Sequence, residues 1–105
     1  MKRTKRRYLA LQLDMPTGDL PSDREFMDAV WGSITQLYGE YGASQANLVL
    51  INYDVEQKLA IIRVNLPALS NLRASIATII QIINKPAAVH VLAVSGTIKA
   101  LTKQL

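Results

Sequence analysis

The side chains that perform most enzyme chemistry are scarce in this sequence. Cysteine is absent, which excludes thiol catalysis, thiolate metal sites and disulfides together. The single histidine, His90, lies between two valines, and residues 58–105 contain no carboxylate that could orient its ring. We expect it to be a partly buried strand residue. The acidic residues lack the clustering of a metal site, so we predict no catalytic residue, no metal site and no cofactor bound by this chain.

The charged residues, by contrast, are sorted along the chain. Residues 1–7 hold five bases and no acid, residues 8–57 hold all eight acids and one base, and residues 58–105 hold six bases and no acid. The net charges of these blocks, +5, −7 and +6, sum to the +4 of the whole chain. This sorting predicts a surface that binds a polyanion such as RNA. The alternative is a solvated tail combined with chance.

Two groups of residues are candidate contacts to such a polyanion. One is the basic arm at 1–7, which could follow a phosphate backbone or simply be a disordered tail. The other is the Ser95-Gly96-Thr97 turn with Lys99, where backbone N–H groups could hold an anion; alternatively, Thr97 is an ordinary helix cap. The full set of predicted RNA contacts is Lys2, Arg3, Lys5, Arg6, Arg7, Arg63, Ser95, Gly96, Thr97, Lys99 and Lys103.

The periodicity of apolar residues predicts the elements that position these contacts. Alternation over 7–14 predicts a strand. Ser22 and Glu25 form a capping box that begins a helix, and Gly39 and Gly42 are natural stops for it.

The second half of the chain supplies four more elements. Two strands at 47–53 and 58–65, joined by a short turn, should pair as a hairpin. Pro67 opens a second helix that should run to about residue 84, followed by a strand at 89–94 and a short helix that ends near Gln104. The apolar face of the second helix would be Leu69, Leu72, Ile76, Ile79, Ile80 and Ile83.

The order βαββαβ with a terminal helix predicts an α+β, ferredoxin-like (split βαβ, RRM-like) sandwich with an antiparallel sheet. It would form a single domain over 8–105, behind the basic arm at 1–7. The strands at 58–65 and 89–94 are apolar on both faces, so the terminal helix or a partner should cover part of the second face. Sheets that stack RNA bases need aromatics on the first and third strands, and the third strand has none. We therefore expect RNA to be held through phosphates and shape.

No apolar run resembles a signal peptide or approaches the roughly 18 residues of a membrane span. The sequence accordingly predicts a cytoplasmic protein that makes no contact with a membrane.

Four segments resemble a known family. They are RRYL at 6–9, YGEYGA at 38–43, IIRV at 61–64 and VSGTIK at 94–99. Together they are similar to the archaeal ribonuclease P protein component 2 family, which is shared with a eukaryotic subunit of ribonuclease P and its mitochondrial-RNA-processing relative. The strand that runs into Ser95-Gly96-Thr97 is the most specific part of the resemblance.

The resemblance implies a non-catalytic, RNA-binding subunit of ribonuclease P, the complex that removes the 5′ leader of precursor tRNA. The RNA of that complex would be the catalyst and would hold the Mg²⁺ that the reaction needs. This chain would bind the catalytic domain of the RNA and protein component 3, would self-associate within the complex, and would meet precursor tRNA only indirectly. The residues expected at the protein interface are Met27, Trp31, Tyr38, Leu92 and Val94.

Two other classes of protein remain open at this level. A protein-interaction or small-ligand regulatory module could use the same fold without any sorting of charge. A small acylphosphatase-like hydrolase would need an arginine and an asparagine that converge on a phosphate, and Arg63 with Asn65 is the only such pair close in sequence.

Overall fold

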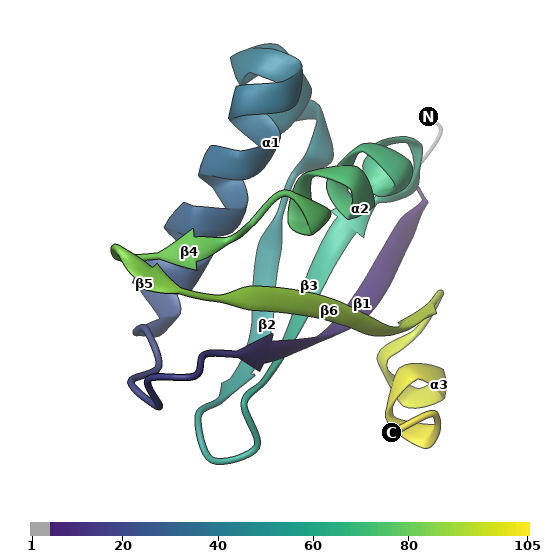
Figure 1. Ribbon diagram of the computed structural model, residues 1–105. Helices are drawn as coiled ribbons and strands as arrows, with labels where there is room; N and C mark the ends of the chain where they lie inside the picture. Colours follow the sequence, from purple (N-terminus) through teal and green to yellow (C-terminus); the bar gives the residue numbers. More distant parts are fainter. Residues whose placement is uncertain (1–4) are drawn as a thin grey trace.

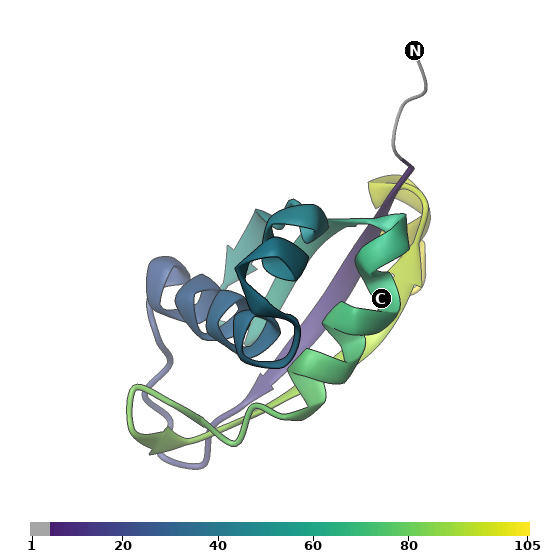
Figure 2. The same ribbon diagram turned by 90° about the horizontal axis from the view of Figure 1, so that it is seen from above.

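Four long strands form one antiparallel sheet, with two helices packed on one face (Figures 1 and 2). The structure, a computed structural model, describes residues 5–105, so Lys2 and Arg3 lie outside the described residues. The strand order is β2-β3-β1-β6, which is the order of a ferredoxin-like sheet. The predicted fold class is confirmed. The bounds of these elements are β1 (Arg6–Asp14), α1 (Asp23–Ala46), β2 (Val49–Asp54), β3 (Leu59–Asn65), α2 (Leu69–Ala77) and β6 (Ala88–Ser95).

The predicted capping box begins α1. The backbone N–H of Glu25 donates to Ser22 Oγ at 3.2 Å, and the N–H of Ser22 donates to Glu25 Oε1 at 2.8 Å. The predicted stop is only partly right. Gly39 has φ 75° and breaks the regular helix, but the chain resumes helical geometry and ends at Ala46, where Asn47 adopts a left-handed conformation. Gly39 therefore kinks this helix instead of ending it, because buried residues on both sides of the glycine keep the two helical segments packed.

The second helix is shorter than predicted. A short 3-10 helix, η1 (Leu66–Ala68), leads into α2, which ends at Ala77 instead of continuing to about residue 84. Beyond it, β4 (Gln81–Ile82) and β5 (Lys85–Pro86) form a small hairpin. The run of isoleucines after Thr78 explains the error, because β-branched side chains lose rotamer freedom in a helix.

The apolar side chains form two clusters, one on each face of the sheet. The larger cluster lies between the sheet and the helices and includes Leu9, Leu11 and Leu13, the alternate residues of β1. On the other face, Leu101 of α3 (Ile98–Lys103) is fully buried in a cluster with Ala10, Ile61 and Ala93, and Figure 1 shows α3 beyond the sheet from α1 and α2. The terminal helix therefore covers part of the second face, as the apolar strands predicted.

Candidate nucleic-acid interface

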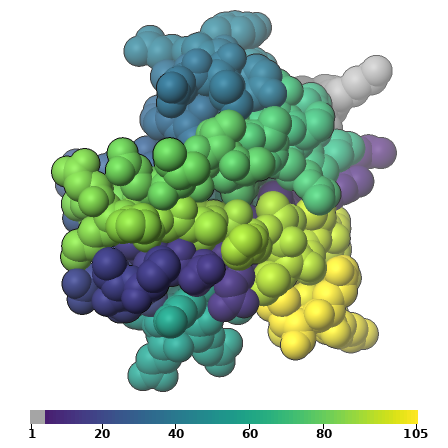
Figure 3. Space-filling view, viewed as in Figure 1, coloured from purple at the N-terminus to yellow at the C-terminus, as the bar shows by residue number. Residues whose placement is uncertain are grey.

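One end of the sheet collects several of the predicted contacts, because antiparallel pairing sets the start of β1 beside the ends of β3 and β6. Tyr8 lies opposite Arg63 on one side and opposite Ser95 on the other. In the space-filling view, the start of β1 (purple) and the C-terminal segment (yellow) lie on the same side of the molecule (Figure 3). We call this region, formed by residues 5–8, 63–65 and 95–99, the basic end of the sheet.

The side chain of Arg7 lies beside the Ser95-Gly96-Thr97 turn. A Cβ built on Gly96 would lie 3.7 Å from Nη1 of Arg7, which is an ordinary van der Waals distance. The same Nη1 donates to the backbone carbonyl of Arg6 at 2.9 Å. The two groups of predicted contacts, separate in sequence, thus adjoin in space.

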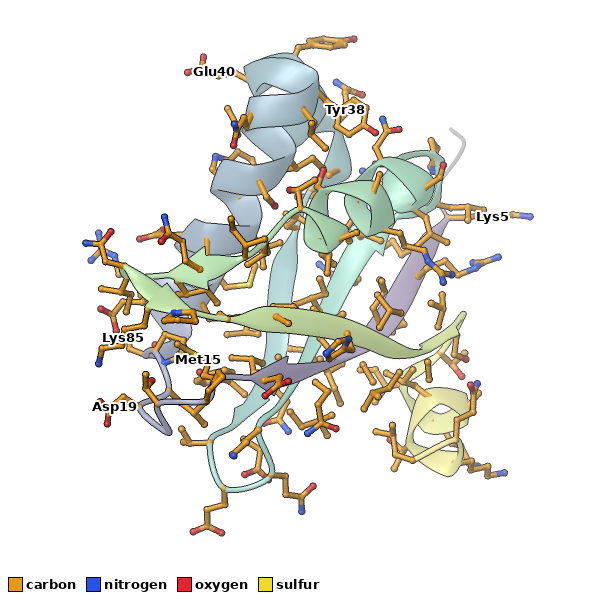
Figure 4. All side chains as sticks on the ribbon, viewed as in Figure 1. Lys5, Met15, Asp19, Tyr38, Glu40 and Lys85 are labelled. Atoms are coloured by element: carbon orange, nitrogen blue, oxygen red, sulfur yellow. The ribbon has the colours of Figure 1, made fainter. Side chains whose placement is uncertain are left out.

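The described part of the predicted arm is attached to the sheet. Arg6 and Arg7 belong to β1, one residue earlier than the predicted start of the strand, and the Lys5 carbonyl accepts from the N–H of Leu66 at 2.7 Å. The side chains of Lys5 and Arg6 are exposed. Lys5 extends away from the start of β1 in Figure 4.

The turn after β6 is built as a helix cap, which was the alternative prediction for it. Thr97 Oγ1 accepts from the N–H of Ala100 at 3.1 Å, and the N–H of Thr97 donates to Ser95 Oγ at 3.4 Å. Two of the N–H groups that could hold an anion are therefore already engaged. Positive charge beside the turn comes instead from side chains, namely half-buried Arg7 and exposed Lys99.

The remaining predicted bases differ in their surroundings. Arg63 is half-buried on β3, and its Nε is buried without a hydrogen-bond partner among residues 5–105. Lys103 is exposed in the last turn of α3. The hydrolase arrangement is not present, because the amide of Asn65 donates to the backbone carbonyl of Gln45 at 2.9 Å instead of pointing to a phosphate shared with Arg63.

The opposite end of the sheet is acidic. β1 ends at Asp14, β2 ends at Asp54, and the turn after β2 holds Glu56. In the loop nearby, Asp19 pairs with Lys85 at 3.0 Å (Figure 4). Both partners are exposed, so this pair adds little stability. β1 thus runs from a basic end to an acidic end, so the charges are separated in space, although Lys58 and Lys85 of the acid-free segment also lie at the acidic end.

The residues predicted to meet a protein partner lie on two elements. Trp31 and Tyr38, on α1, are 43% and 38% exposed, whereas Met27 is half-buried and packs against the larger core. On β6, which is an edge strand, Leu92 is 48% exposed and Val94 packs against that same core. The structure leaves Trp31, Tyr38 and Leu92 as the exposed members of the set.

His90 is exposed rather than partly buried, and it lies opposite Gln12 on the second face of the sheet. Within residues 5–105, no cluster of three or more His, Cys, Asp or Glu residues could hold a metal ion. No helix in the same range has the length and apolarity to cross a membrane.

The strand order places this protein in the class of ferredoxin-like α+β domains. The basic end of the sheet is its candidate site. The Rpp14/Pop5 family model matches residues 7–105, and the chain belongs to that family. It is 34% identical to ribonuclease P protein component 2 of Methanosarcina barkeri, over 97% of this chain and 73% of that protein. It is 30% identical to the protein of the same name from Pyrococcus horikoshii, over 97% and 83%.

A solved structure shares the fold. A chain in the cryo-EM structure of yeast ribonuclease MRP superimposes with a TM-score of 0.74, over 92% of this chain and 78% of that one. The two sequences are 19% identical, so this likeness supports the fold alone.

Proposed function

We propose that this chain is a non-catalytic, RNA-binding subunit of ribonuclease P that supports the catalytic RNA during removal of the 5′ leader from precursor tRNA. Membership of the Rpp14/Pop5 family supports the assignment to this complex. One observation carries the RNA-binding part of the proposal, namely that the Arg7 side chain lies beside the Gly96 turn, which brings two basic segments together on one surface.

The mode of binding follows from what this surface offers. Lys5, Arg6 and Lys99 are exposed cations, and such side chains neutralise phosphates without reading base sequence. Tyr8, the one aromatic on β1, is half-buried against the cluster beneath α3. The sheet therefore offers a phosphate-binding end rather than a stacking platform.

Within the complex, the chain would meet RNA and protein through different surfaces. Trp31 on α1 and Leu92 on β6 lie outside the basic end of the sheet and are exposed. They are the proposed contacts to protein component 3 and to a second copy of this chain. Mg²⁺ would be held by the RNA, and precursor tRNA would be reached through that RNA.

Direct binding of the full chain to ribonuclease P RNA tests the RNA-binding part. Lys99→Glu should weaken binding, because it reverses a charge at the basic end. Lys58→Glu makes the same change of charge at the acidic end and should bind like the wild type. Equal loss in both variants would mean that only net charge matters and would contradict the proposed surface. Binding that is indifferent to salt would favour the regulatory module instead.

Reconstitution tests the assignment to the complex. The RNA and the other proteins of ribonuclease P are combined with or without this chain, and the rate of leader cleavage from precursor tRNA is measured. We expect the rate to fall when the chain is omitted. An unchanged rate would remove the chain from this function even if it binds RNA.

A further inference from the structure

A pocket of about 480 Å³ opens between the kinked end of α1 and the start of α2, and the proposed function gives it no role. Pro67 is among its lining residues, together with two tyrosines and three residues with side-chain amides. We call it the tyrosine–amide pocket after these five polar residues, which are Tyr38, Tyr41, Gln45, Asn65 and Asn71. The tyrosines belong to the YGEYGA segment at 38–43.

Two glycines shape this segment in ways that other residues would not permit. Gly39 has φ 75°, which disfavours residues with a Cβ, and its conformation produces the kink in α1. A Cβ on Gly42 would lie 2.7 Å from the Cβ of Tyr38, closer than real atoms approach. In Figure 4, Tyr38 points to the side of α1 that faces α2, while Glu40 points the other way. The kink thus directs an aromatic ring into the pocket and an acid away from it.

The lining residues have the chemistry of a site for an unpaired nucleobase. Tyr41 is 78% exposed and Tyr38 is 38% exposed, so both rings present surface on which a base could stack. No hydrogen bond among residues 5–105 engages the side-chain amides of Gln45 and Asn71 or Oδ1 of Asn65. Amide groups of this kind can donate to and accept from the edge of a base.

The pocket adjoins the basic end of the sheet. Asn65, one of its lining residues, lies opposite Arg6 in the sheet, and the next residue, Leu66, donates its N–H to the Lys5 carbonyl. A strand of RNA whose phosphates lie on Lys5 and Arg6 would therefore have the pocket within reach of its bases. The two tyrosine rings, the side-chain amides and the neighbouring cations together favour an RNA base over an apolar protein segment as the occupant.

We propose that the tyrosine–amide pocket holds an unpaired base of the RNA, stacked on a tyrosine ring with its edge against the amides. This inference rests on the proposed function, because it needs RNA at the neighbouring basic residues. It assigns Tyr38 to the RNA instead of to a protein partner. It also places base stacking at the kink of α1, away from the sheet.

The test measures binding of the full chain to ribonuclease P RNA for Tyr41→Ala and Tyr41→Phe. Tyr41→Ala should weaken binding by about 5- to 100-fold, the effect of losing one stacked base, and the dependence on salt should stay the same because no charge is removed. Tyr41→Phe keeps the ring and should bind within about twofold of the wild type. Leu37→Ala, which truncates a neighbouring exposed side chain on α1 outside the pocket, is the matched control and should bind like the wild type.

Chemical probing of the RNA locates the contact. A reagent that modifies unpaired bases should find at least one nucleotide protected by the wild-type chain and by Tyr41→Phe but not by Tyr41→Ala. Protection that is equal in all three variants would place the base elsewhere and overturn the inference.

The outcomes separate this inference from the proposed function. Normal affinity of Tyr41→Ala, together with strong and salt-dependent binding by the wild type, overturns the pocket and leaves the function standing. A wild-type chain that does not bind the RNA overturns both. If Tyr41→Ala binds RNA normally but loses protein component 3, the pocket is a protein-docking site and the inference is wrong.

Discussion

At the scale of the residue, Gly42 is the position where the kink of α1 is most tightly specified. Gly42→Ala forces its new Cβ against Tyr38, so we expect the free energy of unfolding to fall by about 1–3 kcal/mol, the usual cost of overpacking. Gly32, in the same helix, has nothing within 4 Å of a built Cβ. Gly32→Ala should be neutral or stabilising by up to about 1 kcal/mol, because alanine favours the helix. Urea unfolding measures both, and a Gly42→Ala variant as stable as Gly32→Ala would contradict the close approach.

Tyr53 makes a stability contribution that depends on pH. Its hydroxyl donates to the Pro21 carbonyl at 2.6 Å, and its ring stacks on Phe26 with centroids 5.5 Å apart. Burial raises the pKa of Tyr53 above its usual value of 10.0, and the carboxylates of Asp23 and Glu25 raise it further. The unfolded chain therefore releases this proton first, and the stability that Tyr53 contributes is complete below pH 10 and is lost as the pH rises through the folded pKa.

Tyr53→Phe separates these effects. At neutral pH, the variant should be less stable by about 0.5–1.5 kcal/mol, because it lacks the hydrogen bond to Pro21. Above pH 10 the two proteins should converge, since only the wild type loses stability through this titration. Thermal unfolding from pH 7 to pH 11 tests this, and a gap that widens with pH would show that the sign is wrong.

At the scale of the element, α3 is the cover of the second sheet face, and Leu101 is its only fully buried side chain. Leu101→Ala should lower the free energy of unfolding by about 2–5 kcal/mol, through lost apolar burial and the cavity left behind. Leu105 is 53% exposed and provides the control, because Leu105→Ala should change stability by no more than about 0.5 kcal/mol. If the two variants were equally stable in chemical denaturation, α3 would not be docked as described.

The hairpin of β4 and β5 contains a residue that suits its turn poorly. Ile83 and Asn84 form the turn with φ 53° and 63°, as a type I′ turn requires, but a β-branched side chain is strained at positive φ. Ile83→Asn should therefore raise the free energy of unfolding by about 1 kcal/mol. Because Ile83 is 50% exposed, little apolar burial is lost to offset this gain. A lower melting temperature for the variant would mean that the packing of Ile83 contributes more to stability than its exposure indicates.

The same segment shows where sequence reasoning failed. Strict alternation predicted β1 correctly, and the Ser22–Glu25 capping box predicted the start of α1, because each pattern reflects interactions between residues close in sequence. The isoleucines after Thr78 satisfy a helical spacing and a strand spacing equally well, so their conformation is decided by tertiary packing. Ile79 and Ile82 are buried, whereas Ile80 and Ile83, which belong to the predicted apolar face of the helix, are 77% and 50% exposed.

The candidate site could be predicted only in part, because only some of its features arise from residues close in sequence. Runs of charge are visible in sequence, so the basic segments at both ends of the domain could be found. The proximity of Arg7 to Gly96 depends on the sheet order, and the tyrosine–amide pocket depends on the kink of α1 and on the hydrogen bond between Asn65 and Gln45. Such long-range contacts have no signature in a local pattern.

At the scale of the whole molecule, the sheet separates bases from acids along the direction of β1. The acidic end would face away from bound RNA, because a polyanion repels it. Electrostatic orientation of this kind acts within about 10 Å at ordinary ionic strength, less than the roughly 30 Å that the nine residues of β1 span. The two ends therefore act as separate surfaces, and the position of a charge should matter more than the total.

Two variants of equal net charge test this separation. Arg7→Gln removes a cation from the basic end, and Lys58→Gln removes one from the turn at the acidic end. The logarithm of the affinity for ribonuclease P RNA is measured against the logarithm of the salt concentration. Arg7→Gln should make the slope shallower by about 0.7–0.9, the value for one phosphate contact, while Lys58→Gln should leave it unchanged. If both variants shifted the slope equally, the affinity would depend only on the total charge of the chain, and the basic end would not be the binding surface.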